Sequence, residues 1–487
     1  MPGLFSLRKT MMFRRFRRKP KVASFDVFDT LIARRGGAPH TIFDAIERAT
    51  KIEGFAETRR IAEASLQPSQ YSLSDIYRKI GQLLQISDAQ AGALKDLEIE
   101  QEVAATIPIM ETLSLIRTGD LLLSDMYLDA STILRLVRKA GLSVDVNIIV
   151  TTDGKHAGKT WSLAMRDYEI SRHVGDNFHS DCLMAGRVGI DAKHFTASAL
   201  TQTETFLRDA GLGSLALLCR EVRLGTFHED DTCRSLQIAQ ASLNFPMLLL
   251  FREYIIRFAE RSGIDHVLLS GRDCHQLHML CRAIPSKITF EYFHTSRVAR
   301  MRGSAAYDKY ALSRLRDDGT LIIDLCGTGW SLSNLLTRIG SKARCLFLHK
   351  LPEVDEYEAL RATERAIDIA SLIEARSSAD AENGMLEFAN AIDTPSTIDV
   401  AEMGSKFFPI HKEETRAFHE LLLVREQMRV FEKSVMTMLH NGPPNLADIS
   451  DEALKDTILS LYSALSKYWG KFHASDDNAS VMAMISG

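Results

Sequence analysis

Short, almost fully apolar runs alternate with amphipathic helical patterns up to about residue 200, and this alternation constrains the fold more than any other feature. Runs that are apolar at nearly every position predict β-strands covered on both faces, as in a parallel sheet between two layers of helices. The sequence therefore predicts an α/β fold with a doubly wound parallel sheet. The predicted strands are Val22–Phe28, Asp120–Ser124, Val146–Thr151, Arg172–Gly175 and Lys193–Phe195.

One long insertion interrupts the alternation directly after the first predicted strand. From about residue 39 to 118 the pattern is helical throughout, and apolar residues such as Ile42 and Ile46 recur on one helix face. Ser74 and Asp75 mark the start of one of these helices. A helical block at this point of the chain is expected to form a cap over the carboxyl edge of the sheet.

A second alternation of strand and helix patterns starts near residue 245. The segments "HVLLS", "ITFEYF", "LIIDLC" and "RCLFLHK" predict a further, Rossmann-like α/β domain over residues 245–350. With a first α/β domain over 22–205, a helical linker over 206–244 and a mostly helical region over 351–487, the chain has several domains. This division agrees with the two to four domains expected of 487 residues.

Residues 1–21 form a basic leader with eight lysine and arginine residues and no acidic residue. Two interpretations stay open: a basic amphipathic segment that lies on an anionic membrane surface, or a disordered leader. The leader lacks the apolar segment of a secretory signal, and no apolar run reaches the roughly 18 residues of a membrane span.

The composition is that of an ordinary globular protein, with 45% hydrophobic and 25% charged residues. A formal net charge of −4 gives no indication of a nucleic-acid partner. The seven cysteines are an odd number without metal-ligand spacing, which favours reduced thiols in a cytoplasmic protein over a disulfide framework.

Reactive side chains stand where the predicted strands of the first domain end. Asp26 and Ser124 close the first and second strands, Asp176 follows the fourth, and Lys155 and Asp181 lie a few residues beyond strand ends. In an open parallel sheet these ends form the ligand-binding edge, so we expect the side chains to converge. Convergent carboxylates favour Mg²⁺, and a lysine and a hydroxyl beside a metal suit a phosphate group.

Four segments, in this order, resemble the motifs of the haloacid dehalogenase (HAD) superfamily over roughly residues 21–205. "FDVFDTL" resembles the first motif, Ser124 in "LLLSDMY" the second, Lys155 in "KHAGKTW" the third, and "HVGDNFHSD" the fourth. The resemblance implies a Mg²⁺-dependent hydrolase with a HAD-type sheet and an inserted helical cap.

The resemblance also implies a role for each carboxylate. Asp26 would be the nucleophile and form an aspartyl-phosphate. Asp26, Asp176 and the backbone carbonyl of Phe28 would hold Mg²⁺, and Asp181 would support this set. Read without the resemblance, Asp181 also fits the N-cap of the next helix.

The two other matching residues would act on the phosphoryl group. Ser124 would hydrogen-bond a phosphate oxygen, and Lys155 would neutralise charge on the nucleophile and the phosphoryl group. The neighbouring histidines, His156, His173 and His179, have no metal-ligand spacing, so core or solvated roles are expected for them.

Phe28 departs from the pattern of HAD phosphatases, which place a second aspartate two residues after the nucleophile as general acid and base. The proton for the leaving group is therefore unassigned. Dehalogenase members also carry an aromatic residue at this position, which keeps dehalogenation as a third hypothesis. Asp29 stands where many members have glycine, and no catalytic role is expected for it.

The motifs "FDxFDTL" and "SDMYL", with "RD" after a later apolar strand, resemble one branch of predicted HAD hydrolases, found with bacterial surface-polysaccharide biosynthesis. This resemblance implies a phosphatase of a small phosphorylated metabolite, such as a sugar phosphate or nucleotide-sugar phosphate. The alternative is a catalytically weak ligand-binding or assembly component of such a pathway. Phe28 favours the alternative, whereas the complete set of motif residues favours the hydrolase.

A second candidate site lies in "LIIDLCGTGWSLSNLL" of the later α/β domain. Gly327, Thr328, Gly329 and Ser331 would present backbone N–H groups at a helix N-terminus, which predicts an anion-binding loop. The other interpretation is a plain turn between a strand and a helix.

This segment also resembles, in part, the phosphoribosyl-pyrophosphate loop of type I phosphoribosyltransferases. Asp324 matches the first acidic position of that loop, and Leu325 replaces the second. Arg272 and Arg297 follow neighbouring predicted strands and are expected to complete a site for an anionic ligand. Asp324 equally fits a structural role in the loop.

Overall fold

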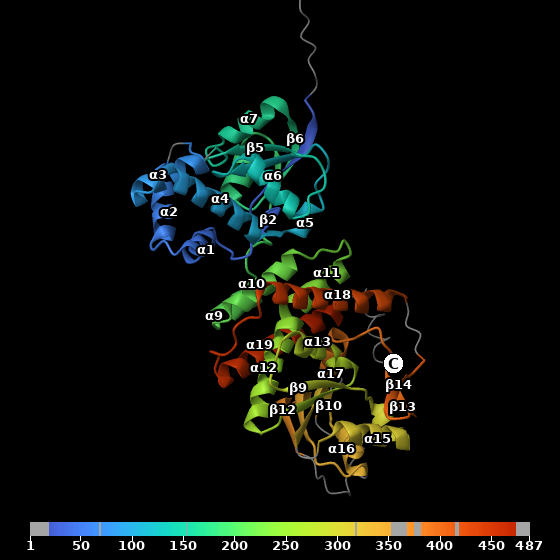
Figure 1. The fold of residues 1–487 in the computed structure, drawn as a ribbon. Helices are drawn as coiled ribbons and strands as arrows, with labels where there is room; N and C mark the ends of the chain where they lie inside the picture. The colour runs from blue at the N-terminus through green and yellow to red at the C-terminus, as the bar shows by residue number, and fades with distance from the viewer. Residues whose placement is uncertain are drawn as a thin grey trace, which may run out of the picture. The chain divides into compact units, whose positions relative to one another are not determined.

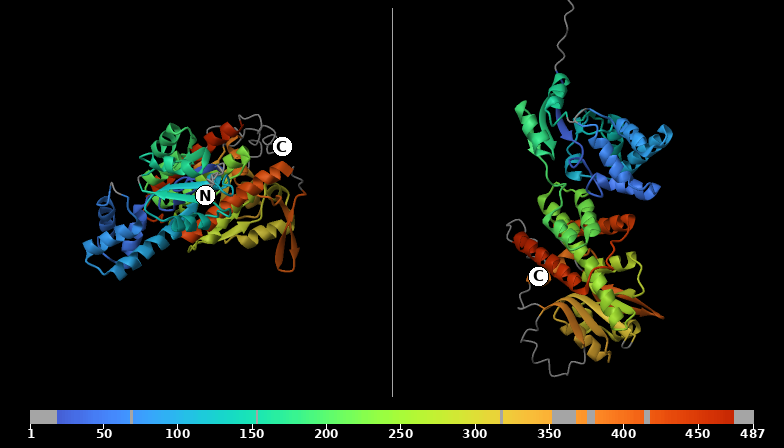
Figure 2. Two further views of the ribbon diagram at one scale, coloured as in Figure 1. Left: turned by 90° about the horizontal axis from the view of Figure 1, so that it is seen from above. Right: turned by 90° about the vertical axis from the view of Figure 1, so that its left-hand side faces the viewer.

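The computed structural model describes residues 19–67, 70–152, 154–316, 319–351, 368–374, 381–413 and 418–473. The chain forms two compact units, Met1–Ser198 and Ala199–Gly487 (Figures 1 and 2). Each unit is built around its own five-stranded parallel sheet, so the predicted α/β class with parallel sheets is confirmed. The basic leader lies outside the described residues, except for residues 19–21.

The sheet of the first unit has the spatial order β5-β4-β1-β6-β7, and all of its pairings are parallel. The chain moves outward from β1 through β4 to β5 and then returns to β6 on the other side of β1. The carboxyl ends of β4, β1 and β6 are consequently neighbours at the ligand-binding edge. The strands are β1 (Lys21–Asp26), β4 (Leu121–Asp125), β5 (Asn147–Thr151), β6 (Glu169–Gly175) and β7 (Asp191–His194).

These strands are the five that the apolar runs predict, with ends displaced by a few residues. Leu121, Leu123 and Phe25 are fully buried, which agrees with a sheet covered on both faces. The helices that connect the strands are α6 (Ala130–Lys139), α7 (Lys159–Asp167) and α8 (Met184–Arg187).

The insertion after β1 contains four helices that form a group beside the sheet of this unit (Figure 1). They are α1 (His40–Thr50), α2 (Phe55–Ala64), α3 (Leu73–Leu84) and α4 (Asp88–Ala105). Helix α3 is capped by Ser72, whose hydroxyl accepts the Asp75 N–H, so Asp75 belongs to the start of the helix as predicted, but the capping residue is Ser72 and not Ser74.

A two-stranded antiparallel ribbon joins this helical group to the sheet, and the prediction of a purely helical segment is therefore wrong. The ribbon pairs β2 (Ile32–Arg34) with β3 (Thr106–Pro108), and the short helix α5 (Met110–Leu113) follows. The β-branched residues Thr106 and Ile107 suit an extended chain, and Pro108 is tolerated because the ribbon has only two strands.

Buried ion pairs hold the insertion together. Arg59 of α2 and Glu98 of α4 are both fully buried, and they form two hydrogen bonds of 2.7 and 2.8 Å. The Tyr77 hydroxyl of α3 donates to the same carboxylate at 2.6 Å. Three helices thus meet at the buried Glu98 carboxylate, and this charge is tolerated in the interior only while its hydrogen bonds are complete.

The second unit contains a parallel sheet of spatial order β12-β11-β10-β8-β9. Its strands are β8 (His266–Ser270), β9 (Thr289–Phe293), β10 (Thr320–Gly327), β11 (Arg344–Lys350) and β12 (Ile369–Glu374). The four apolar segments of the second alternation account for β8 to β11. Strand β12 lies beyond residue 350, in the region expected to be mostly helical.

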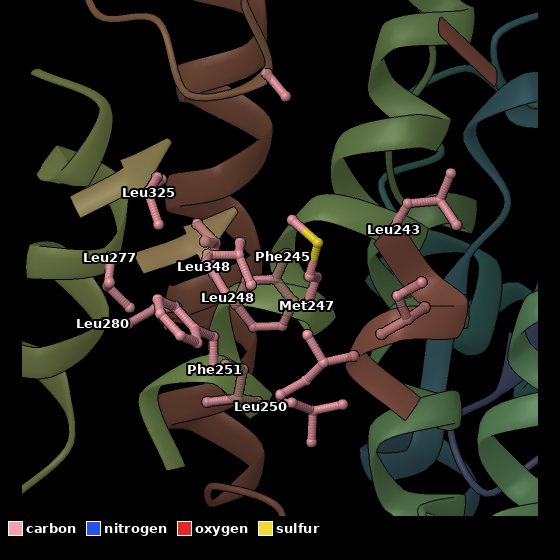
Figure 3. Close-up of a cluster of buried hydrophobic side chains, with 14 of the residues drawn as sticks. Leu243, Phe245, Met247, Leu248, Leu250, Phe251, Leu277, Leu280, Leu325 and Leu348 are labelled. Atoms are coloured by element: carbon pink, nitrogen blue, oxygen red, sulfur yellow. The ribbon is translucent and has the colours of Figure 1, made fainter. Parts of the chain in front are cut away.

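Helices cover both faces of this second sheet. Along β10, Leu321 and Ile323 belong to the larger hydrophobic cluster, whereas Ile322 belongs to the smaller cluster on the opposite face. The larger cluster joins the sheet to α12, α13, α18 and α19, and Figure 3 shows part of it. The smaller cluster joins it to α14, α15 and α16. Period-two alternation with both faces buried explains why the strand is apolar at nearly every position.

The remaining elements of the second unit are mainly helical. Residues 206–244, predicted to form a linker, contribute Leu215, Cys219 and Leu236 to the larger cluster. The helices are α9 (Gln202–Asp209), α10 (Gly213–Leu224), α11 (Asp231–Ala239), η2 (Gln240–Asn244), α12 (Phe245–Arg261), η3 (Arg272–Cys274), α13 (His275–Ala283), α14 (Arg297–Arg302), α15 (Ala305–Arg314), α16 (Trp330–Arg338), α17 (Ala381–Ala389), α18 (Phe418–Asn441) and α19 (Asp451–His473). A hairpin pairs β13 (Thr397–Met403) with β14 (Lys406–His411).

None of the described helices is both long and apolar enough to cross a membrane. All seven cysteines are free thiols, in agreement with the expectation from their number and spacing.

Replacement of Arg59 by alanine is expected to lower the unfolding free energy of the first unit by about 3–5 kcal/mol, because it leaves the Glu98 carboxylate buried without its main partner. The next residue, Arg60, is the matched control, since it is 46% exposed and pairs with the exposed Glu57. Arg60→Ala is expected to cost about 0–1 kcal/mol. Hydrogen exchange of the β1 and β4 amides in the full chain measures both values, and equal losses would contradict the prediction.

Candidate active site

Four of the residues predicted from the first-domain motifs lie together at the carboxyl edge of the first sheet. Asp26 is the last residue of β1, Asp176 directly follows β6, and Asp181 lies in the π-helical turn η1 (Phe178–Leu183). Their carboxylates offer ligand oxygens that are all within 4.8 Å of one another. Lys155 Nζ is 2.5 Å from Asp26 Oδ1 and 2.6 Å from Asp181 Oδ1.

The two other predicted residues lie beside this group. Ser124 is buried near the end of β4, one residue beyond Leu123, which pairs with Asp26 across the sheet. Phe28 follows Asp26 by two residues and forms an isolated bridge with Ile32. No ionisable side chain therefore stands at the position two residues after the predicted nucleophile.

Negative charge exceeds positive charge in this cluster, because three carboxylates share one lysine. Burial, the charge of Asp26 and the charges of Asp29 and Asp181 raise the pKa of Asp176 to about 7. Burial also raises the pKa of Asp26 to about 6, although Lys155 opposes the shift. The carboxylates raise the pKa of Lys155 despite its burial, so the lysine stays charged.

Asp181 is the most strongly held carboxylate of the cluster. Burial alone would raise the pKa of Asp181, but the hydrogen bond from His173 and the charge of Lys155 lower it to about 2. Its second oxygen accepts the Asn177 N–H at 3.0 Å. Asn177, whose side chain accepts the Ser180 N–H, is the N-cap of this turn, so the alternative interpretation of Asp181 as a helix cap is wrong.

His173, within β6, holds the Asp181 carboxylate in position. It is fully buried in β6, and burial lowers the pKa of His173 to about 4, so its ring is neutral at pH 7. Nε2 is 3.3 Å from Asp181 Oδ1, and Nδ1 is 2.8 Å from the Ser24 hydroxyl. We assign the N–H to Nε2 from this network, with Ser24 donating to Nδ1. The expected core location of His173 is confirmed, but its contact with the site could not be read from spacing.

Asp125 organises the loop that carries Lys155, and sequence reasoning gave it no role. Its Oδ1 accepts the Gly154 N–H at 2.9 Å and the Thr151 hydroxyl at 2.6 Å. Its Oδ2 accepts the N–H of Lys155 at 3.1 Å. The sequence signal for this role was the position of Asp125. It ends β4, next to the strand that leads into the loop with Lys155.

Gly175 leaves the space that the Asp181 side chain occupies. A Cβ atom at residue 175 would overlap the carboxyl group of Asp181. The last residue of β6 must therefore be glycine if Asp181 is to reach Lys155 and Asp26.

The arrangement provides a buried carboxylate, a fixed ammonium group and several hard oxygen donors around one point. The donor set fits a divalent cation, because a cation would offset the negative charges of Asp26 and Asp181, which add to burial in raising the pKa of Asp176. Carboxylate nucleophiles beside a lysine suit the transfer of a phosphoryl group.

The residues predicted for the second site also lie at one carboxyl edge, that of the second sheet. Arg300 of α14 connects them: its guanidinium donates to Asp324 at 3.0 Å and to the Ser331 hydroxyl at 3.3 Å. Arg300 is buried, whereas the predicted Arg297 is exposed one turn earlier in the same helix. Asp324 therefore neutralises a buried arginine in this structure.

The glycine-rich loop caps α16. Gly327 has φ 140° and Gly329 has φ 81°, so both use conformations that favour glycine. The Thr328 hydroxyl accepts the Trp330 N–H at 3.2 Å, which satisfies one helix N–H internally. Arg272 lies directly after Gly271, at the end of β8. The loop geometry agrees with a turn between strand and helix, and anion binding stays a prediction.

Two further groups of side chains have ligand atoms close together. Asp273, Cys326 and Glu387 form one, and His228, Asp230 and Cys233 form the other. Asp230 of the second group caps α11 by accepting the Cys233 N–H at 2.8 Å, so a helix cap accounts for its position.

No model of a known protein family matches this chain, and no curated protein matches its sequence.

Gly175→Ala is expected to destabilise the first unit by about 1–3 kcal/mol, because Asp181 has to leave its position or the strand has to move. Gly186→Ala, in the neighbouring helix α8, is the matched control, since nothing lies within 4 Å of the added Cβ. That change is expected to be neutral or stabilising by up to about 1 kcal/mol. Hydrogen exchange of β6 amides measures the difference, and a neutral Gly175→Ala would contradict the proposed steric role.

Asp176→Asn is expected to stabilise the protein at pH 8 in the absence of divalent cations. The pKa of Asp176 is raised from 3.8 to about 7 in the folded state, so the stability that its protonated form gives is complete below pH 4 and is lost as the pH rises to 7. Asparagine resembles the protonated acid and removes this cost, which we expect to be roughly 1–3 kcal/mol.

Hydrogen exchange of β6 amides at pH 8 and pH 4, with a chelator present, tests this prediction. The stabilisation is expected at pH 8 and should nearly vanish at pH 4, where wild-type Asp176 is protonated. A gain of equal size at both pH values would contradict the electrostatic cause.

Proposed function

We propose that the first unit is a Mg²⁺-dependent hydrolase of the HAD superfamily that removes a phosphoryl group from a small phosphorylated metabolite. The observation that carries this proposal is the convergence of Asp26, Asp176, Asp181 and Lys155, which come from three different parts of the chain. The helical insertion directly after β1, where the resemblance implies a cap, supports it.

In this proposal Asp26 attacks phosphorus through a carboxylate oxygen, and the bond to the leaving group breaks. Lys155 stays charged and balances the negative charge of Asp26 and of the phosphoryl oxygens. Ser124 donates its hydroxyl to one of those oxygens. Water then attacks the aspartyl-phosphate, which releases phosphate and restores the carboxylate.

Asp26, Asp176 and the carbonyl of Phe28 would hold Mg²⁺, with Asp181 supporting them. The ion would supply positive charge against the phosphoryl oxygens. Asp181 in turn is fixed by Lys155, His173 and the Asn177 N–H, so it supports the site from a rigid position.

The proposed setting is a cytoplasmic reaction of surface-polysaccharide biosynthesis, with a sugar phosphate or nucleotide-sugar phosphate as substrate. This part rests on the resemblance to the predicted hydrolases of such pathways, and the seven free thiols support a reducing compartment. A second candidate function is a ligand-binding or assembly component of the same pathway, which Phe28 favours because it cannot act as general acid. Dehalogenation comes last, since it rests only on the aromatic residue Phe28, and its independence of metal separates it from the hydrolase.

Asp26→Asn is expected to reduce phosphate release by roughly 10³-fold or more, because the amide cannot form the aspartyl-phosphate. The test uses sugar phosphates and an aryl phosphate, each with and without Mg²⁺. Asp129→Asn is the matched control: Asp129 caps α6 by accepting the Thr132 N–H at 2.7 Å, and asparagine keeps such a cap.

Three outcomes separate the candidate functions. Mg²⁺-dependent release that is lost in Asp26→Asn supports the hydrolase. Absence of release from every compound, including the aryl phosphate, would overturn it in favour of a binding or assembly role. Metal-independent halide release from a 2-haloacid would indicate a dehalogenase.

A further inference from the structure

The strand order of the second sheet reverses between β8 and β10, and reactive side chains lie at that point. The chain runs from β8 outward to β9 and then returns to β10 on the other side of β8. In an open α/β sheet, ligands bind outside the carboxyl ends of the strands at such a topological switch point. Asp273 follows β8 by three residues, and Cys326 is the last residue but one of β10, so both lie at this edge.

Three potential metal ligands converge there. An oxygen of Asp273, the thiol of Cys326 and an oxygen of Glu387, from α17, all lie within 4.8 Å of one another. Cys326 is 8% exposed and forms the buried end of the group, whereas Glu387 is exposed to solvent. The group is consequently anchored in the sheet and open on one side, as a site that exchanges an ion has to be.

Negative charge is not balanced within this group. The described residues donate no hydrogen bond to the Asp273 carboxylate. Burial and the charges of Glu387 and Asp324 raise the pKa of Asp273 to about 7. Arg300, the nearby buried cation, is already paired with Asp324. A divalent cation between Asp273 and Glu387 would supply the missing positive charge.

A buried amide group one helical turn after Asp273 gives a second indication of a ligand. Gln276 is 1% exposed, and its Nε2 has no hydrogen-bond partner among the described residues, although its Oε1 accepts a hydrogen bond from Gln240 at 2.7 Å. Asp273 and Gln276 are three residues apart and share a helix face, and helical side chains lean toward the N-terminus. A buried donor without a partner indicates a polar atom of a ligand or of water beside it.

Helix α17 repeats the same spacing on the other side. Asn390 follows Glu387 by three residues, and the Asn244 amide contacts Asn390 at 3.1 Å and Gln276 at 3.2 Å. The segment η3–α13 and helix α17 therefore meet at two successive levels, with Asp273 and Glu387 at one and the amide groups at the other. The unpaired donor of Gln276 belongs to the level that adjoins the three ligands.

We propose that Asp273, Cys326 and Glu387 bind a divalent metal ion of the Zn²⁺ type in the second unit. A thiolate with two carboxylates favours Zn²⁺ or Co²⁺ over Mg²⁺, which prefers oxygen ligands alone. Zn–O and Zn–S bonds of about 2.0–2.3 Å hold ligand atoms roughly 3–4 Å apart, so small side-chain rotations close the site. The ion replaces the thiol proton of Cys326, which passes to solvent.

Three protein ligands leave a fourth position for water or a ligand atom, as in catalytic zinc sites. Gly327 directly follows Cys326 and begins the loop that is predicted to bind an anion. An oxygen of an anionic ligand that completes the coordination would therefore lie at the start of this loop.

The first test adds Co²⁺ alone to the reduced, metal-free full chain. Co²⁺ held by a thiolate has a charge-transfer absorption band in the near ultraviolet, which a carboxylate site such as that of the first unit cannot produce. The band is expected in the wild type and in Cys182→Ser, whose thiol is next to Asp181 in the sequence, but not in Cys326→Ser. Absence of the band from the wild type would overturn the inference.

A further cysteine variant tests the other group of potential ligands that contains a thiol, namely His228, Asp230 and Cys233. The Co²⁺ band is expected to persist in Cys233→Ser. If the band is lost in Cys233→Ser and kept in Cys326→Ser, the ion is bound at that group instead, and the proposed site is wrong.

Competition for Zn²⁺ with a chromophoric chelator tests the two carboxylates. Glu387→Gln and Asp273→Asn are each expected to weaken Zn²⁺ binding about tenfold or more, because even residues that only support a metal ligand typically cost 10–100-fold. Asp265→Asn is the matched control, since Asp265 is 79% exposed and directly precedes β8, at the opposite end of that strand. Equal Zn²⁺ affinities of Glu387→Gln and Asp265→Asn would contradict the three-residue site.

Folding of the variants is checked separately. Glu387 is exposed, so Glu387→Gln is expected to fold as the wild type does and keeps the inference falsifiable. Hydrogen exchange of the β10 amides shows whether Cys326→Ser and Asp273→Asn keep the second sheet. Loss of Zn²⁺ binding counts in favour of the site only in variants with wild-type protection.

Discussion

The first unit depends on one charge balance: a single ammonium group, that of Lys155, lies between two buried carboxylates, and a third, partly buried carboxylate lies beside them. Several local features exist because this cluster has to be held. Asp125 fixes the loop that carries the lysine, and His173 fixes Asp181 from within β6. Gly175 keeps the necessary space free. Burial and the remaining excess of negative charge together raise the pKa of Asp176, and a bound cation would offset that charge.

The fold of both units could be predicted where the sequence follows one clear period. Strands covered on both faces are apolar throughout, so β1 and β10 are visible as runs, and their order along the chain implies the parallel sheets. Short extended segments cannot be predicted from such runs. The three residues of β3 carry no measurable period, and β12 follows a stretch without apolar runs. The buried face of helix α4 could not be predicted from periodicity, because it carries Glu98 and Glu102 and charged residues are counted as exposed.

The candidate site was predictable for the residues that stand at strand ends, since topology alone brings strand ends together. Residues that contact the site only through another side chain could not be predicted in this way. Ser24 and His173 lie inside strands, and only the register of β1 against β6 places them next to each other. In the second unit the strand-end rule found Asp324 but missed Arg300, its buried partner, because only the packing of α14 decides that Arg300 is buried and Arg297 exposed.

Phe28 is better understood as part of the packing of the helical insertion than as a single departure from the motif. Helix α4 presents Glu98 and Glu102 on one face; the first pairs with Arg59 of α2, and the second with Arg34, which covers Phe28. An aspartate at residue 28 would stand against Arg34 and compete with Glu102 for its guanidinium. The ion pair that fixes the end of α4 to the ribbon therefore also requires a neutral side chain at residue 28, so the packing of the helical insertion and the composition of the candidate site depend on each other.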